Sequence, residues 1–194
     1  MSGQLLVLEG PDGVGKTTIA DGLEERLKTG GIAVRRFSSP GNQAGTLGAL
    51  VYAIHHEPKR FGLTRLPSEA LQALHIAAHL DMIDNDVKPA IIAGDFVLLD
   101  RFWWSTWVYG RQHDAARHTL DALIQAEQIH WDPIVPLAVI LLNRSNGDQR
   151  LAQLYQQLGE IQSAHYPVLH VSNSLSPHET VSAIMHLVGP LLKS

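Results

Sequence analysis

Hydrophobic residues along the chain form two kinds of segment: short continuous apolar runs, and longer stretches in which apolar residues recur every three or four positions. The runs have the length of buried β-strands, and the stretches have the spacing of amphipathic helices. The predicted strands cover residues 4–8, 32–37, 96–99, 137–142 and 168–171. The predicted helices cover residues 16–28, 46–56, 67–87, 104–110, 115–128 and 148–163, and a last helix begins after Ser176.

Two helix boundaries carry explicit signals. Gly30 and Gly31 follow the first predicted helix, where glycine commonly ends a helix. Ser176 precedes the last helix, with Glu179 three residues later, which is the spacing of a capping box. Pro89 lies close to the predicted end of the helix over residues 67–87.

Helical segments separate the predicted strands, and this order indicates the fold class. A strand that is joined to the next by a helical crossover pairs with it in parallel, and helices then cover both faces of the sheet. We expect a three-layer α/β/α fold with a central, mostly parallel, five-stranded sheet. Residues 1–194 contain no repeat, low-complexity tract or linker, so the chain is predicted to be a single domain.

Composition and charge exclude several classes of function. Fifteen Lys and Arg against nineteen Asp and Glu give a net charge of −4, which argues against binding to a nucleic acid polymer. The absence of cysteine removes disulfides, thiolate metal sites and cysteine nucleophiles. No run reaches the roughly 18 apolar residues of a membrane span, and the N-terminus lacks the cationic start of an export signal. We therefore expect a cytoplasmic protein without a membrane partner.

Residues 10–17, with the sequence GPDGVGKT, match the phosphate-binding pattern G-x-x-x-x-G-K-[ST] between a predicted strand and a predicted helix. The glycines let backbone N–H groups face an anion, and the helix N-terminus adds partial positive charge. Lys16 would reach the β- and γ-phosphates, and the Thr17 hydroxyl would ligate Mg²⁺. The expected ATP-binding residues are Gly10, Pro11, Asp12, Gly13, Val14, Gly15, Lys16, Thr17 and Thr18.

This motif makes the expected fold that of a P-loop NTPase, with ATP and Mg²⁺ as cofactors. The alternative is a glycine-rich turn without a ligand. A P-loop does not fix the reaction, because GTPases, ATPases and kinases all use it.

Asp100 and Arg101 follow the predicted strand over residues 96–99. The carboxyl ends of parallel strands form the ligand-binding edge of an α/β sheet. There Asp100 would hold Mg²⁺, directly or through its water, and Arg101 would offer a planar fork to a second phosphate. An Asp–Arg surface ion pair is the alternative interpretation.

Two segments resemble the thymidylate kinase family. Residues 9–18 (EGPDGVGKTT) are similar to its E-G-x-D-G-x-G-K-T-T loop, and residues 100–109 (DRFWWSTWVY) to its D-R-Y-x-x-S-x-x-A-Y segment. The resemblance implies transfer of the ATP γ-phosphoryl group to a nucleoside monophosphate, with dTMP as the default acceptor. It is poor over residues 143–164. Members of the family commonly dimerise, which leaves a homodimer open.

The resemblance also implies roles for residues of the acceptor site. Arg101 would bind the acceptor phosphate, and Asp12 would approach the acceptor sugar hydroxyl. Ser105 and Tyr109, four residues apart on one helix face, would line the sugar and base pocket. The nearby aromatic residues would either stack on a base or fill the core: Phe102, Trp103, Trp104 and Trp107.

Two segments of the predicted acceptor site depart from the family. Ser38 and Pro40 belong to an SSPG turn where the family has R-E-P-G, so a hydroxyl replaces a phosphate-contacting arginine. His75 and His79, which share a helix face, stand where the family has an aromatic residue and an arginine over thymine. These histidines would contact the acceptor. The alternatives are a zinc site, or solvated or core histidines without a functional role.

The third departure is an abbreviated lid over residues 143–164. Family members without a second basic residue in the P-loop supply arginines from the lid, and Pro11 and Val14 leave this P-loop without one. Arg144 and Arg150 are the candidate catalytic arginines, with Arg111 as a third. Such an arginine would neutralise charge on the transferred phosphoryl group. Ordinary surface charge is the alternative for Arg144 and Arg150.

These departures leave two further functions open. One is a kinase for a nucleoside or another small-molecule acceptor, since two arginines of the family are missing. The other is an NTP-binding regulatory ATPase, although the chain has no N-K-x-D segment for guanine recognition.

Overall fold

A computed structural model describes residues 3–144 and 148–193 of the chain. Five strands form one sheet in the order β2-β3-β1-β4-β5, and every neighbouring pair is parallel. The strands are β1 (Gln4–Glu9), β2 (Val34–Ser38), β3 (Phe96–Asp100), β4 (Ala138–Asn143) and β5 (Val168–Ser172). The predicted five-stranded α/β sheet is therefore confirmed, and the described strands are parallel throughout.

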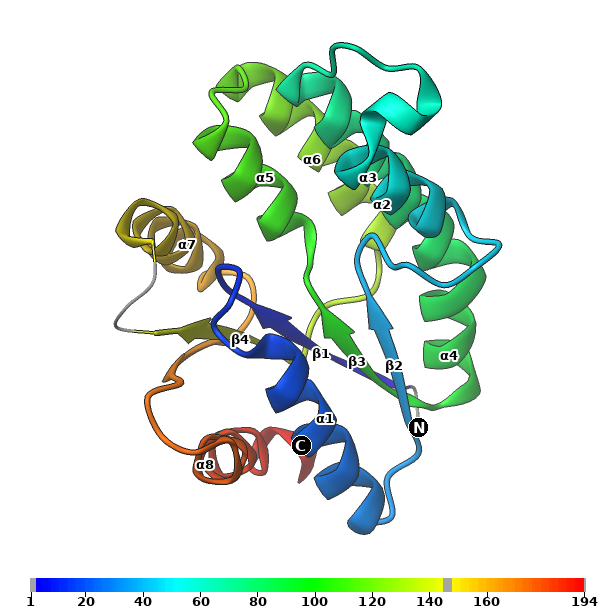
Figure 1. Ribbon diagram of the computed structural model, residues 1–194. Helices are drawn as coiled ribbons and strands as arrows, with labels where there is room; N and C mark the ends of the chain where they lie inside the picture. The colour runs from blue at the N-terminus through cyan, green and yellow to red at the C-terminus, as the bar shows by residue number, and fades with distance from the viewer. Residues whose placement is uncertain (1–2, 145–147, 194) are drawn as a thin grey trace.

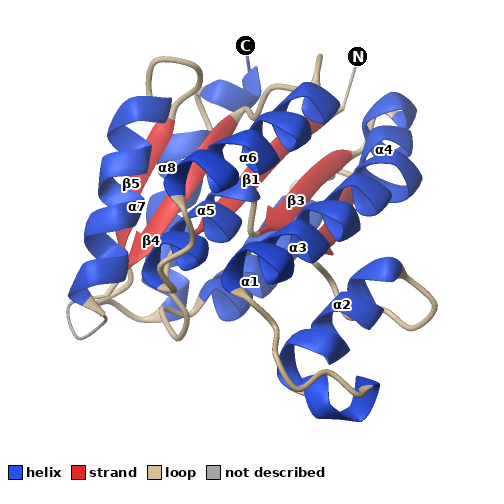
Figure 2. Ribbon diagram, turned by 90° about the horizontal axis from the view of Figure 1, so that it is seen from above, coloured by secondary structure: helices blue, strands red, loops and turns tan. Residues whose placement is uncertain are grey.

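Helices cover both faces of this sheet (Figures 1 and 2). The helices are α1 (Lys16–Thr29), α2 (Leu47–His56), α3 (Ser68–Met82), α4 (Lys88–Ala93), α5 (Trp103–Gln112), α6 (Arg117–Trp131), α7 (Gln149–Gln162) and α8 (Pro177–Val188). Short helical turns occupy Pro58–Phe61, Ile83–Val87 and Leu191–Lys193. The predicted capping box at Ser176 and Glu179 is present at the start of α8.

Alternate residues of β1 point to opposite faces of the sheet and belong to two hydrophobic cores. Leu5 and Val7 pack in the core that is covered by α3 to α7, whereas Leu6 and Leu8 pack in the core that is covered by α1 and α8. Because β1 lies in the middle of the sheet and is buried on both faces, the loop that follows it starts from a rigid strand.

The predicted helix over residues 67–87 begins as expected, but its predicted end is wrong. After α3, a π-helical turn over Ile83–Val87 leads directly into α4, which continues past Pro89. Pro89 lies in the first turn of α4, where a missing N–H costs little. In the π-turn the N–H of Lys88 bonds to the carbonyl of Ile83, so the chain stays helical across the proline.

The aromatic residues at the start of α5 pack in the core. Phe102, Trp103 and Trp104 are buried together against the sheet, and the indole N–H of Trp104 donates to the hydroxyl of Tyr166 at 3.0 Å. Trp107 is half-buried, and its indole N–H donates to Asp121 at 3.0 Å. The core interpretation of the three buried aromatic residues is confirmed.

The carboxyl ends of the central strands meet at one edge of the sheet (Figure 1). In the strand register, Leu8 of β1 lies beside Asp100 of β3, and Glu9 lies beside Leu141 of β4. Asp100 and Arg101 therefore emerge beside the P-loop, as predicted, and Arg144 follows the neighbouring strand on the other side of β1. Among the described residues, no helix combines the length and apolar character that crossing a membrane requires.

Candidate active site

The P-loop follows β1 and leads into α1, and its glycines are required by backbone geometry. Gly10 and Gly15 have φ angles of 138° and 91°, in the region that favours glycine. A Cβ atom at Gly10 would lie 2.2 Å from the carbonyl oxygen of Leu142, so no larger residue fits there. The loop can thus pass close to β4 and turn into the N-terminus of α1, as an anion-binding loop requires.

Asn173, in the turn after β5, braces this loop. Its amide nitrogen donates to the carbonyl of Val14 at 2.6 Å, and its amide oxygen accepts from the hydroxyl of Thr180 at 3.0 Å. The sequence assigned no role to Asn173, because the loop that it contacts at Val14 lies 159 positions away in the chain.

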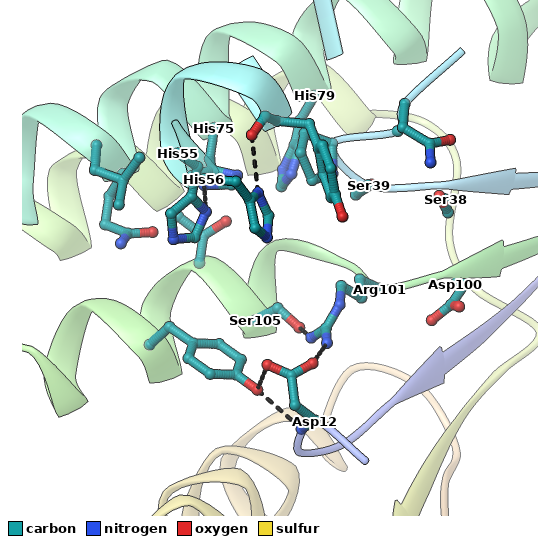
Figure 3. Close-up of a pocket in the computed structure, with 18 of the residues that line it drawn as sticks. Asp12, Ser38, Ser39, His55, His56, His75, His79, Asp100, Arg101 and Ser105 are labelled. Carbon is teal, nitrogen blue, oxygen red and sulfur yellow. Dashed lines mark hydrogen bonds and ion pairs between the residues drawn. The ribbon is translucent and has the colours of Figure 1, made fainter. Parts of the chain in front are cut away.

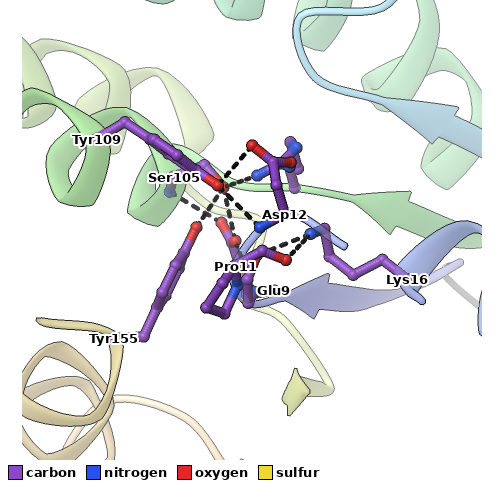
Figure 4. A network of polar contacts seen from close by, with 9 residues as sticks. Glu9, Pro11, Asp12, Lys16, Ser105, Tyr109 and Tyr155 are labelled. Atoms are coloured by element: carbon purple, nitrogen blue, oxygen red, sulfur yellow. Dashed lines mark hydrogen bonds and ion pairs between the residues drawn. The ribbon is translucent and has the colours of Figure 1, made fainter. Parts of the chain in front are cut away.

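Lys16 folds back onto the P-loop (Figure 4). Its ammonium group donates to the carbonyl oxygens of Gly10 and Pro11, both at 2.7 Å, and the side chain is buried. Burial and the nearby charge of Arg101 lower the pKa of Lys16 to about 8, against the attraction of neighbouring carboxylates. The ammonium thus has two carbonyl partners that an anion in the loop would replace.

Glu9, the last residue of β1, is fully buried and holds the start of α5 (Figure 4). Its carboxylate accepts from the backbone N–H of Phe102 at 2.7 Å and of Ser105 at 3.1 Å, and from the Ser105 hydroxyl at 2.8 Å. Burial raises the pKa of Glu9, while Arg101 and these hydrogen bonds act in the opposite direction. Glu9 therefore fixes α5 relative to the P-loop strand.

Ser105 connects three elements of the site. Its hydroxyl lies 2.8 Å from the hydroxyl of Tyr155, a fully buried residue of α7. It also accepts a hydrogen bond from the guanidinium of Arg101 at 2.8 Å. Because Ser105 bonds to Glu9 as well, β1, α5 and α7 share one polar network beneath the site.

Asp100 ends β3, and its carboxyl group is buried beside the P-loop. Among the described residues, no hydrogen-bond partner meets its Oδ1 atom. Burial raises the pKa of Asp100, and the charges of Lys16 and Arg101 oppose that effect. A buried carboxylate oxygen without a partner is a suitable ligand for a hard cation.

Arg101 pairs with Asp12 of the P-loop rather than with Asp100 (Figure 3). The backbone of Arg101 has a φ of 72°, a conformation that is rare for residues other than glycine and common at functional sites. Its guanidinium lies over the Tyr109 ring, 5.6 Å from the ring centre. The surface ion pair between neighbouring residues, offered as an alternative, is therefore not what the structure has.

Tyr109 forms a polar group together with Asp12 and Arg101. Its hydroxyl donates to the Asp12 carboxylate at 2.7 Å and accepts from the Asp12 N–H at 2.9 Å. Burial alone would raise the pKa of Asp12, but the charge of Arg101 and the Tyr109 hydrogen bond lower it overall. Burial and the Asp12 hydrogen bond raise the pKa of Tyr109 to about 12. At neutral pH the group thus consists of a carboxylate, a guanidinium and a neutral phenol.

A cavity of about 540 Å³ opens above this group, between α3, α5 and the turn after β2. All predicted acceptor-site residues line it: Asp12, Ser38, Pro40, His75, His79, Arg101, Ser105 and Tyr109. Residues that sequence reasoning missed also line it, including Gln72, Thr106, His55, His56 and His113. Asp100 borders the same space, so the cavity adjoins the P-loop.

The family model for thymidylate kinase matches residues 8–163 of this chain. The chain belongs to the thymidylate kinase family. The thymidylate kinase of Synechococcus sp. (strain RCC307) is 31% identical over 97% of this chain and 96% of its own length. That of Haemophilus ducreyi (strain 35000HP / ATCC 700724) is 32% identical over 100% of this chain and 90% of its own length.

A shorter match is the thymidylate kinase of Pseudomonas fluorescens (strain SBW25), which is 34% identical over 66% of this chain and 60% of its own length. Membership of the thymidylate kinase family makes the chain a phosphotransferase of the nucleotide kinase type, as the resemblance implied.

In this thymidylate kinase family member, histidines of α2 and α3 form one wall of the cavity (Figure 3). Nε2 of His75 lies 3.3 Å from Nδ1 of His55. Burial, followed by the neighbouring histidines, lowers the pKa of His75 to about 3, so its ring is neutral at physiological pH. Within residues 3–144 and 148–193, no three His, Asp or Glu side chains are grouped so as to hold a metal ion.

The candidate lid arginines of this family member lie outside the cavity lining. Arg144 follows β4 and is exposed, and Arg150 lies in the first turn of α7, 3.6 Å from Asp114. Arg111 donates to the carbonyl of Ala115 at 3.2 Å, which holds it at the end of α5. Of the predicted lid, residues 145–147 lie outside the described residues, and α7 forms most of the remainder.

Proposed function

We propose that this protein transfers the γ-phosphoryl group of ATP to a deoxynucleoside monophosphate, with dTMP as the acceptor. The position of Arg101 carries this proposal: its guanidinium borders a cavity that adjoins the P-loop, where it suits the phosphate of a second nucleotide. The relatives named thymidylate kinase support dTMP in particular.

The donor site is assigned to the P-loop. Residues 10–18 would surround the triphosphate with backbone N–H groups, and Lys16 would exchange the carbonyls of Gly10 and Pro11 for the β- and γ-phosphate oxygens. Phosphate oxygens would favour the charged ammonium, whose pKa is lowered by burial and by the charge of Arg101.

The residues beside the P-loop fit Mg²⁺. Asp100 supplies a buried carboxylate oxygen without a partner among the described residues, and Thr17 supplies an exposed hydroxyl in the first turn of α1. Both are the oxygen ligands that Mg²⁺ prefers. When bound there, the ion would neutralise charge on the donor phosphates.

The acceptor site is assigned to the cavity. Arg101 would leave Asp12 and bind the acceptor phosphate, and Asp12 would then accept a hydrogen bond from the acceptor sugar. Tyr109 and Ser105 would hold these two residues in place from α5. Ser38 and Pro40 would bound the phosphate end of the acceptor, and His75 and His79 its base.

In the transfer step, an oxygen of the acceptor phosphate bonds to the γ-phosphorus as the bond from that phosphorus to the bridging oxygen breaks, and ADP leaves. Positioning of the two phosphates and neutralisation of their charge supply most of the catalysis. Lys16 and Arg101 provide this positive charge, and Arg144 or Arg150 would add to it from the lid.

The single domain over residues 1–194, a homodimer and a cytoplasmic location stay predictions.

A coupled assay of ADP release, over a panel of nucleosides and nucleoside monophosphates, tests this function. The proposal predicts that ADP forms only with an acceptor and fastest with dTMP. ADP release without an acceptor would instead favour a regulatory ATPase. Turnover with nucleosides but not with monophosphates would move the function to a nucleoside kinase.

A further inference from the structure

Glu127 is a carboxylate on the buried face of α6, at 1% exposure. Both of its oxygens are used: Oε1 accepts from the indole N–H of Trp131 at 3.0 Å, and Oε2 lies 2.8 Å from Nδ1 of His79. A buried carboxylate is costly unless hydrogen bonds compensate for the lost water. These two donors explain how the Glu127 carboxylate can be buried. The contact with His79 also links α6 to a histidine of the cavity.

This contact decides which nitrogen of His79 carries a proton. An ionised carboxylate only accepts hydrogen bonds, so Nδ1 of His79 must carry the hydrogen that lies between them. In the neutral ring, Nε2 then has a free lone pair and is an acceptor. His79 lines the cavity while its Nδ1 bonds to Glu127, so Nε2 is the ring nitrogen left to accept from a ligand in the cavity.

The wall around His79 is polar and carries little charge. Gln72, His75 and His79 lie on one face of α3 and all line the cavity, and Gln72 is buried. Figure 3 shows the histidines on one side of the cavity and Arg101 with Asp12 on the other. A ligand with one charged end and one uncharged heterocyclic end would match this division.

We propose that Nε2 of His79 accepts a hydrogen bond from a ring N–H of the acceptor base, and that Glu127 is the positioning residue that keeps His79 in this tautomer. The substrate class is a nucleotide whose base presents a ring N–H, as the N3–H of thymine and uracil does. This inference rests on the proposed function, because it assigns the base end of the same acceptor site.

The test compares dTMP with 3-methylthymidine 5′-monophosphate, which lacks that N–H, at pH 7.5. Wild-type enzyme should use the methylated acceptor with a kcat/KM at least about 10-fold lower, because Nε2 is left without a donor. In His79→Ala the ratio between the two acceptors should fall below about 3-fold. A merely structural defect would lower both acceptors alike and leave the ratio unchanged.

Glu127→Gln separates a hydrogen bond from a steric clash, since His79 stays in place. The indole of Trp131 can only donate, so it takes the amide oxygen of the new glutamine, and the amide N–H then faces Nδ1 of His79. The ring proton moves to Nε2, which no longer accepts. The KM for dTMP should rise about 10-fold, while the KM for ATP and the use of the methylated acceptor stay within about 2-fold.

Glu160→Gln, on the exposed face of α7, is the matched control and should change neither acceptor. If Glu127→Gln does not fold, the ratio between the two acceptors in wild-type enzyme and in His79→Ala still tests the inference. Equal use of dTMP and its methylated analogue by wild-type enzyme would overturn the inference. Failure to phosphorylate any monophosphate would instead overturn the proposed function.

Discussion

The carboxylate of Asp12 and the guanidinium of Arg101 form an ion pair across the floor of the cavity, although 89 positions separate them in the chain. One belongs to the loop after β1 and the other to the segment after β3, so the pair links the proposed donor and acceptor sites. It holds the arginine in place before any ligand binds, which reduces the side-chain entropy that binding would cost. An acceptor phosphate would then replace Asp12 as the partner of Arg101.

Arg101→Ala should therefore weaken binding of the acceptor and leave binding of ATP nearly unchanged. A charge-assisted hydrogen bond contributes about 1.5–3 kcal/mol, so the KM for dTMP should rise about 10- to 100-fold. Steady-state kinetics with each substrate varied in turn measures the two effects, and Arg65→Ala, at an exposed position, serves as the control. A change in the KM for ATP alone would mean that Arg101 belongs to the donor site.

The pH dependence of kcat/KM for ATP should report Lys16 in the free enzyme. Its pKa is lowered to about 8, so its positive charge is present below that pH and is lost as the pH rises through it. The value of kcat/KM for ATP should therefore fall on the alkaline side with an apparent pKa near 8, since this parameter reflects the free enzyme. The kcat profile should stay flat to higher pH, because bound phosphates favour the charged ammonium. An alkaline limb at the same pH in both profiles would argue against this assignment.

Glu9→Gln should destabilise the protein. The glutamine keeps the shape of Glu9, and its amide oxygen can replace Oε1, which accepts from the N–H groups of Phe102 and Ser105. Its amide N–H₂ group would then take the place of Oε2, where it opposes the donors that now bond to that oxygen, the N–H of Gly10 and the hydroxyl of Ser105. Leaving a buried donor unsatisfied in this way should cost about 1–3 kcal/mol of unfolding free energy in urea denaturation. The exposed Glu25→Gln is the control. Unchanged stability would show that Glu9 already carries a proton in the folded state.

Arg144 is the better placed of the two lid arginines, because it directly follows β4, the neighbour of the P-loop strand. Arg150 is drawn toward Asp114, and both of those side chains are mostly exposed. Arg144→Ala should lower kcat at least about 100-fold with little change in either KM, as expected for a charge that acts on the transferred phosphoryl group. Arg150→Ala should change kcat less than about 3-fold. Single-turnover measurements on both variants compare the two losses of rate. A larger loss in Arg150→Ala than in Arg144→Ala would show that Arg150 is the catalytic arginine.

The sequence was most informative where local pattern and chemistry coincide. Two features predicted which edge of the sheet carries the site: a complete P-loop between a strand and a helix, and an Asp–Arg pair at a strand end. Both follow strands, and parallel strands bring their carboxyl ends together. The end of α3 was mispredicted, because proline usually ends a helix and the π-turn before Pro89 has no simple sequence signal.

The parts of the site that were missed depend on contacts between distant elements. Tyr155 reaches Ser105 from α7, and nothing in the spacing of that helix indicates a polar partner. Glu127 did leave a signal: it follows Leu120 and Ile124 and precedes Trp131 on the apolar face of α6, and an acidic residue in such a position requires a buried partner. That the partner is His79 follows only from how α3 packs on α6.

The most direct test of the central claim is ³¹P NMR of the purified protein mixed with ATP, Mg²⁺ and dTMP. Phosphoryl transfer between the two proposed sites predicts the resonances of dTDP and ADP growing in equal amounts while that of dTMP declines. ADP growing together with inorganic phosphate, with dTMP unchanged, would contradict the account.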